Sequence, residues 1–199
     1  MALPESPPKD ESHSEDQRRL LQIARESITS AAAGQPAPPL DLLSLTDWLQ
    51  SIRASFVTLT HAGALRGCIG ALQASLPLAL DVQEHAAAAA TEDYRFTPVG
   101  PEEVDGLDIE ISVLSIPQPL DYDSPQDLLH RLRPHVDGVI LNSGQHRATF
   151  LPQVWEHVPD PVQFLSLLCE KARLPERAWQ NGLLEVQIYQ VESFHEARG

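Results

Sequence analysis

The chain has 199 residues, 42% of them hydrophobic, which is enough to bury a sizeable core in one large domain or in two lobes. Acidic residues outnumber basic ones by 28 to 14, and a formal charge of −14 disfavours general binding to nucleic-acid phosphates. Two cysteines exclude a disulfide scaffold, and no apolar run is long enough to predict a transmembrane helix. The composition therefore favours a reduced, cytoplasmic protein.

The first thirteen residues predict a disordered tail. Residues 1–13 hold three prolines and four charged residues, with almost no large apolar side chain to offset the entropy of ordering. They also lack the apolar stretch of a secretory signal. The folded domain is assigned to residues 14–195, opening with a helix capped at Ser12 or Ser14 and ended by Gly34. One face of this helix carries Leu20, Leu21, Ala24, Ile28 and Ala31.

A β-hairpin is predicted after an ambiguous segment that holds a short helix around residues 46–50. Residues 55–60 are rich in β-branched side chains and favour a strand. Residues 61–63 read as a turn, and residues 64–72 return as the partner strand, weakened by its glycines.

An alanine-rich helix separates this hairpin from an alternating strand. Pro77 suits a first helical turn, and five consecutive alanines favour a helix that runs to about Thr91. Residues 107–114 alternate apolar and polar side chains, as in a strand with one buried face. Between the two, Asp93 and Arg95 stand two positions apart, a poor spacing for an ion pair on an ending helix.

The second half of the chain mixes short helices with another hairpin. Ser124 and Pro125 are typical of an N-cap and a first helical position, in a helix that ends before Pro134. Residues 138–141 and 147–151 predict a hairpin. The remaining predicted elements are helical turns at residues 152–157 and 175–180, a helix that follows Asp160 and buries Cys169, and a last strand at residues 184–191.

The order of these elements indicates an α+β fold. The strands come mainly as hairpins and not as alternating strand–helix–strand units, so we expect a largely antiparallel sheet with helices packed on it.

Residues 65–70, Leu-Arg-Gly-Cys-Ile-Gly, form the strongest candidate for a functional site. Gly67 and Gly70 leave the backbone open to close approach. Arg66 can bind a carboxylate or a phosphate through two hydrogen bonds. Cys68 has two interpretations: a small apolar residue packed inside the sheet, or a reactive thiolate that acts as a nucleophile.

Other charged residues extend this candidate site. Glu110 lies on the polar side of its predicted strand, where it is either solvated or, if that face covers the hairpin, a general acid or base. Arg66 and Arg95 can hold an anion or form structural salt bridges to Asp93 or Glu110. None of the eight histidines has convincing metal-ligand spacing, so neither a metal nor a cofactor is predicted.

Several of these segments together resemble the AMMECR domain family, especially its bacterial members called AmmeMemoRadiSam system protein A. The hexapeptide at residues 65–70 is a specific hallmark of that family, and the resemblance spans residues 20–194. The matching blocks follow in the same order at residues 56–59, 65–70, 93–98, 109–114, 136–138 and 147–155.

The resemblance implies a fold of two lobes, with the hexapeptide lining a cleft between them. It also implies a Memo-like protein and a radical SAM protein as partners. Tyr94 stands where the family often has proline and His85 where it often has asparagine, two departures at the helix end near the expected cleft. The residues assigned to the site are Cys68 and Glu110 as catalytic, and Arg66, Gly67, Gly70, Asp93, Arg95 and Thr149 as substrate-binding.

Three hypotheses for the function remain open at this point. The first is an enzyme in which Cys68 reacts, Arg66 or Arg95 holds an anionic group, and Glu110 assists. The second is a non-catalytic partner or scaffold for the Memo-like and radical SAM proteins. The third is an RNA- or nucleotide-binding module, against which the acidic composition speaks.

Overall fold

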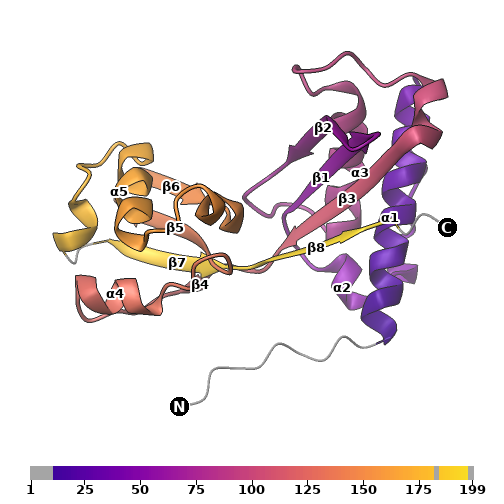
Figure 1. The fold of residues 1–199 in the computed structure, drawn as a ribbon. Helices are drawn as coiled ribbons and strands as arrows, with labels where there is room; N and C mark the ends of the chain where they lie inside the picture. Colours follow the sequence, from indigo (N-terminus) through magenta and orange to yellow (C-terminus); the bar gives the residue numbers. More distant parts are fainter. Residues whose placement is uncertain (1–10, 182–183, 197–199) are drawn as a thin grey trace. The chain divides into compact units, whose positions relative to one another are not determined.

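The computed structural model describes residues 11–181 and 184–196, which belong to two compact units (Figure 1). The first unit runs to Val113 and resumes at Ser193, and the second spans residues 114–192. Helices pack on one four-stranded sheet in each unit, which confirms the α+β class. Among the described residues, no helix is both long enough and apolar enough to cross a membrane.

The first sheet has the strand order β2-β1-β3-β8, and β1 is antiparallel to both β2 and β3. Strand β2 is therefore an edge strand. The elements are α1 (Glu11–Ala32), η1 (Leu42–Ser44), α2 (Asp47–Gln50), β1 (Ser55–His61), β2 (Ala64–Gly70), α3 (Leu78–Thr91), η2 (Pro101–Gly106), β3 (Leu107–Leu114) and β8 (Val191–His195).

The helix boundaries follow local signals, with one exception at the start of the chain. Helix α1 already begins at Glu11, so Ser12 and Ser14 lie inside it and the predicted caps were wrong. Gly34 ends the helical region as predicted, with a positive φ of 68° that favours glycine. Thr46 caps α2, accepting a hydrogen bond from the backbone N–H of Leu49.

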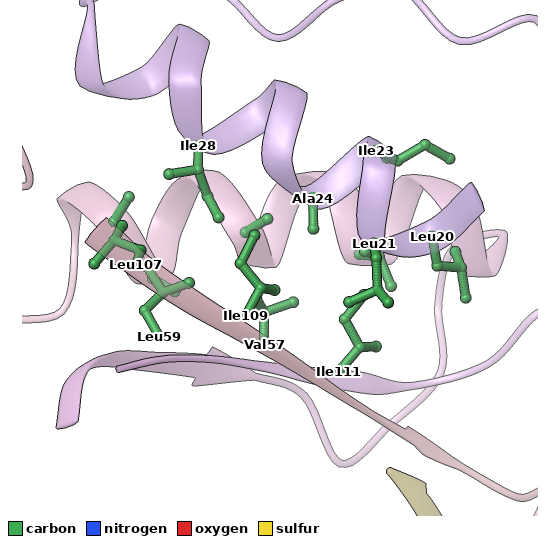
Figure 2. Packing of buried hydrophobic residues seen from close by; sticks show 14 of the residues in the cluster. Leu20, Leu21, Ile23, Ala24, Ile28, Val57, Leu59, Leu107, Ile109 and Ile111 are labelled. Atoms are coloured by element: carbon green, nitrogen blue, oxygen red, sulfur yellow. The ribbon is translucent and has the colours of Figure 1, made fainter. Parts of the chain in front are cut away.

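The core of the first unit lies between one face of this sheet and helices α1 and α3. In Figure 2, α1 crosses above β1 and β3, and its apolar side chains approach those of the strands. Apolar side chains recur at every second residue of the strands and along one face of α1, so each element has one apolar face to bury against the other. The labelled residues of the cluster are Leu20, Leu21, Ile23, Ala24, Ile28, Val57, Leu59, Leu107, Ile109 and Ile111.

The second sheet has the strand order β4-β7-β5-β6 and is antiparallel. Its core includes Trp155, whose ring stacks on that of Phe164 with centroids 3.6 Å apart. Cys169 is fully buried there as predicted, and burial raises the pKa of its thiol. The elements are β4 (Gln118–Pro119), α4 (Pro125–Arg131), β5 (Gly138–Ser143), β6 (His146–Phe150), η3 (Pro152–Glu156), α5 (Pro161–Lys171), η4 (Ala178–Asn181) and β7 (Glu185–Tyr189).

The predicted last strand is in fact two strands in different sheets. Strand β7 ends at Tyr189, and β8 begins at Val191 and joins the first sheet. Gln190 separates them, and its backbone N–H donates to the side chain of Ser115 at 2.9 Å. The chain therefore has one sheet in each unit, where the sequence predicted a single sheet.

Candidate functional site

Cys68 lies on the edge strand β2 with its side chain on the polar face of the first sheet. It pairs with Thr58 on β1, and Thr58 pairs with Glu110 on β3. Paired residues point to the same side of a sheet, so the three side chains form one row. Their neighbours Val57 and Leu59 point into the core. Cys68 is half-buried and is not a member of the apolar core.

The hydroxyl of Thr58 is the direct partner of the Cys68 thiol. Its Oγ1 donates to Sγ across the strand pair at 3.3 Å. The backbone N–H of Cys68 points away from β1, so Cys68 and Thr58 form a pair without mutual backbone bonds, in which side chains come closest. Glu110, next in the row, is exposed.

The side chains of Asp93 and Arg95 bind the backbone of Cys68 on the side of β2 that faces away from β1. Oδ2 of Asp93 accepts from the backbone N–H of Cys68 at 2.8 Å, and Nη2 of Arg95 donates to the carbonyl of Cys68 at 3.4 Å. The two side chains form a two-pronged ion pair, with Nε bound to Oδ1 at 2.9 Å and Nη2 to Oδ2 at 2.6 Å. The poor spacing expected from the sequence does not apply, because α3 has already ended at Thr91.

The Arg95 guanidinium determines the charge state of Asp93. Its hydrogen bonds hold the pKa of the Asp93 carboxyl well below the ordinary value of 3.8, with further lowering by the backbone N–H of Cys68. The same pairing raises the pKa of Arg95. Both groups are charged throughout the physiological range.

The first unit is expected to lose stability in acid through Asp93. A folded-state pKa below the unfolded one gives stability that is complete above the ordinary value of 3.8 and is lost as the pH falls toward the lower folded value. Urea unfolding between pH 6 and pH 2.5, at intervals, should show this decrease for the natural protein and a shallower decrease for Asp93→Asn. Equal pH dependence of the two proteins would contradict it.

The side chain of Arg66 reaches the loop that follows α3. The pairing register between β1 and β2 skips Arg66, a bulge that redirects its side chain. Its Nε and Nη2 bind both carboxylate oxygens of Glu103 at 3.1 Å, and Nη1 donates to the carbonyl of Thr97 at 2.8 Å. These bonds also lower the pKa of Glu103. Arg66 thus fastens this loop to β2.

Gly67 and Gly70 allow two close approaches to β2. A Cβ at Gly67 would overlap the backbone carbonyl oxygen of Ala89 in α3, and one at Gly70 would overlap the ring of Phe56. Both glycines therefore act through packing of the first unit, since neither position tolerates a side chain.

Thr149 belongs to the second unit, on β6. Its hydroxyl lies 3.1 Å from that of Tyr189, whose pKa is raised by burial.

In the same unit, Asp137 is fully buried and accepts hydrogen bonds from the backbone and guanidinium of Arg133 and from the side chain of Gln190. The structure therefore collects Cys68, Asp93 and Arg95 in one place, whereas Thr149 is part of a separate hydrogen-bond network.

A second polar cluster at the start of α3 was not found from the sequence. Asp81 is buried and its Oδ2 accepts from both the backbone N–H and the hydroxyl of Ser55, at 2.8 and 2.6 Å. Nδ1 of His85 lies 3.1 Å from the same oxygen. The spacing of Asp81 and His85 by four residues on a helix was the available signal. Within the described ranges, no group of three or more histidine, cysteine or acidic residues could hold a metal ion.

The geometry defines an α+β protein whose first sheet carries a half-buried thiol beside an aspartate–arginine pair. A family model described as AMMECR1 matches residues 21–194, and the chain belongs to this family. A protein of Methanothermobacter thermautotrophicus is 41% identical over 180 residues, covering 90% of this chain and 93% of its own. One from Methanopyrus kandleri is 34% identical over 185 residues, covering 89% and 86%.

The fold also matches a solved structure. The crystal structure of an uncharacterized protein from Pyrococcus horikoshii has a TM-score of 0.73 and 31% sequence identity, and the match covers 92% of each chain. The match to the family model confirms the resemblance to the AMMECR family that the sequence motifs carry, while the likeness to its bacterial AmmeMemoRadiSam members stays a prediction.

Proposed function

We propose that Cys68 is the nucleophile of an enzyme site whose substrate carries an anionic group. The observation that supports this most strongly is the guanidinium of Arg95, which Asp93 holds against the backbone of the thiol-bearing residue. A guanidinium fixed against the backbone of Cys68 can bind an anionic group of a substrate that reaches the half-buried thiol.

Arg95 is the anion-binding residue in this proposal. Its Nε and Nη2 are occupied by Asp93 and Cys68, and Nη1 has no hydrogen-bond partner in the described part of the chain. The side chain is 43% exposed. Asp93 fixes the plane of the guanidinium, so the free Nη1 edge is available to a carboxylate or a phosphate. Arg66 is not included, because Glu103 and backbone carbonyls occupy its guanidinium.

The thiol and the carboxylate of Glu110 have complementary tasks. The sulfur attacks an electrophilic atom of the substrate, a sulfur–substrate bond forms, and the leaving group departs with its electron pair. Glu110 is the candidate base, and because it lies two strands from Cys68, the thiol proton reaches it only by relay through the intervening Thr58 hydroxyl or a water. Thr58 donates a hydrogen bond to the sulfur and so helps to orient it.

Alkylation by two reagents of different charge tests this proposal. In the native protein, Cys68 is expected to react with iodoacetate faster, relative to neutral iodoacetamide, than it does in the urea-unfolded chain, because Arg95 attracts the carboxylate. We expect the ratio of the two rates to rise several-fold on folding, as measured by mass spectrometry of the Cys68 peptide.

Arg95→Gln should abolish this preference, whereas Arg131→Gln, an exposed arginine of the second unit, should leave it unchanged. A native Cys68 that is inert to both reagents until the chain unfolds would overturn the proposal. If the ratio of the iodoacetate and iodoacetamide rates were unchanged in Arg95→Gln, Arg95 would not attract anions to the thiol, and the proposal would be overturned as well.

A second candidate function is a non-catalytic partner of the AmmeMemoRadiSam type, docking to a Memo-like and a radical SAM protein. Tyr94 supports it, because this aromatic side chain is 95% exposed between Asp93 and Arg95, where an interface residue is expected. Co-purification from the native host should recover both proteins with the natural chain and lose them with Tyr94→Ala. Recovery of neither protein by the natural chain would exclude this candidate.

A further inference from the structure

We infer that the outer edge of β6, in the second sheet, binds an extended acidic peptide that joins the sheet as a further strand. This inference concerns the second unit alone and does not depend on the chemistry proposed for Cys68. It rests on the open backbone groups of β6 and on the basic side chains that flank them.

The backbone groups of two β6 residues point out of the sheet. Strand β6 stands last in the order β4-β7-β5-β6 and is an edge strand. Ser143 and His146 pair across a two-residue loop, and the pair that closes such a hairpin shares two backbone hydrogen bonds. Because backbone groups alternate along the ladder, those of Arg147 and Thr149 point away from β5. The carbonyl of Thr149 agrees with this direction, since it accepts from Nζ of Lys171 at 3.0 Å.

Three of these outward groups are open to another strand. The N–H and the carbonyl of Arg147 and the N–H of Thr149 have no hydrogen-bond partner among residues 11–181 and 184–196. Arg147 is also exposed, so a segment of another molecule can reach its backbone. An edge strand with unpaired donors and acceptors is the surface to which extended peptides add.

Basic side chains flank this edge on both faces of the sheet. Arg147 points away from the core that buries its neighbour Ala148. Helix α5 packs against the core face of β6 (Figure 1), and Lys171 and Arg173 lie at its end. Nζ of Lys171 lies 5.0 Å from the centroid of the Phe150 ring. All three basic residues are exposed, and none has an ion-pair partner within the described ranges.

Arg173 occupies a backbone position that favours glycine. Its φ is 59°, directly after Ala172, the C-cap of α5, where glycine is the usual residue. Nδ1 of His146 lies 3.0 Å from the carbonyl of Ala172, so this turn is held against the start of β6. An arginine at such a position costs conformational free energy, and residues kept at this cost are typical of functional sites.

An acidic peptide is the occupant that matches both the charge and the backbone of this edge. The whole chain has a formal charge of −14, so three unpaired cations around one strand are a local exception. Carboxylates complement these cations, and the backbone of a peptide both donates and accepts hydrogen bonds. A phosphate group only accepts them and leaves the carbonyl of Arg147 unmatched. Acidic residues at adjacent positions reach both faces, because successive side chains of a strand point to opposite sides.

A labelled peptide of sequence Val-Glu-Glu-Val-Glu-Glu-Val tests the inference by fluorescence anisotropy at low salt. It should bind the natural protein at least about tenfold more tightly than the same peptide with glutamine in place of glutamate. Arg147→Gln with Arg173→Gln should abolish this difference. The matched control, Arg131→Gln with Arg177→Gln, changes two other exposed arginines of the second unit and should keep it. No binding at millimolar peptide, or equal affinities of the two double variants, would overturn the inference.

Hydrogen exchange separates strand pairing from general attraction between charges. With saturating acidic peptide, the amides of Arg147 and Thr149 should exchange more than about tenfold slower than in the free protein. Binding that leaves both amides unprotected would overturn the inference. A ten-nucleotide uridine RNA should not displace the peptide at equal concentration. Displacement by this RNA would assign the basic residues to nucleic acid and would overturn the inference as well.

Discussion

Gly67→Ala is expected to destabilise the first unit by about 3 kcal/mol or more, because the new methyl group would overlap a backbone atom of α3. The obstructing atom is the carbonyl oxygen of Ala89, in the run of alanines that lets α3 lie close to β2. Neither backbone can move without disturbing the core between them. Urea unfolding followed by circular dichroism measures the change.

The control for this substitution lies on the same strand. Leu65→Ala truncates an exposed side chain of β2 and should change the free energy of unfolding by less than about 1 kcal/mol. If Gly67→Ala were as mild as Leu65→Ala, the close packing of α3 on β2 would be refuted. The hallmark glycine would then need another explanation.

Asp137→Ala is expected to destabilise the second unit by about 3 kcal/mol, because the buried carboxylate is an acceptor for several groups at once. Its oxygens bind the backbone N–H and the guanidinium of Arg133 and the side-chain amide of Gln190. Alanine leaves the backbone N–H and the amide without their acceptor. Thermal unfolding by calorimetry should show a lower transition temperature for this unit.

Asp137→Asn separates the contribution of the negative charge from that of side-chain shape and hydrogen bonding in this network. Asparagine has the same shape and keeps one carbonyl oxygen as an acceptor, so we expect a smaller loss than for alanine. Equal losses for the two variants would mean that the negative charge, and not the number of acceptors, holds Arg133 and Gln190 in place.

Local patterns predicted most helices and strands of the fold. The β-branched run that became β1, the alanines of α3 and the Ser124–Pro125 start of α4 are signals contained within a few neighbouring residues. The break at Gln190 has no such signal, because an acceptor 75 residues away, Ser115, holds it. The division into two sheets therefore could not be derived from local alternation.

Three of the residues that the sequence assigns to the site, Cys68, Asp93 and Arg95, lie together in the structure, and their roles stay predictions. A spacing of two residues is unfavourable for an ion pair only on a helix, and α3 ends before both Asp93 and Arg95. The partner of Arg66 is Glu103, 37 residues away, and a bulge in β2 decides its direction. Such long-range partners depend on the tertiary fold, for which the sequence has no periodic signature.

The most direct test of the account is a comparison of the two cysteines in the native protein. Limited treatment with iodoacetamide, followed by mass spectrometry of the peptides, should find Cys68 modified and Cys169 protected, because Cys68 is half-buried on the polar face and Cys169 is sealed in the second core. Equal protection of both cysteines until the chain unfolds would contradict the account.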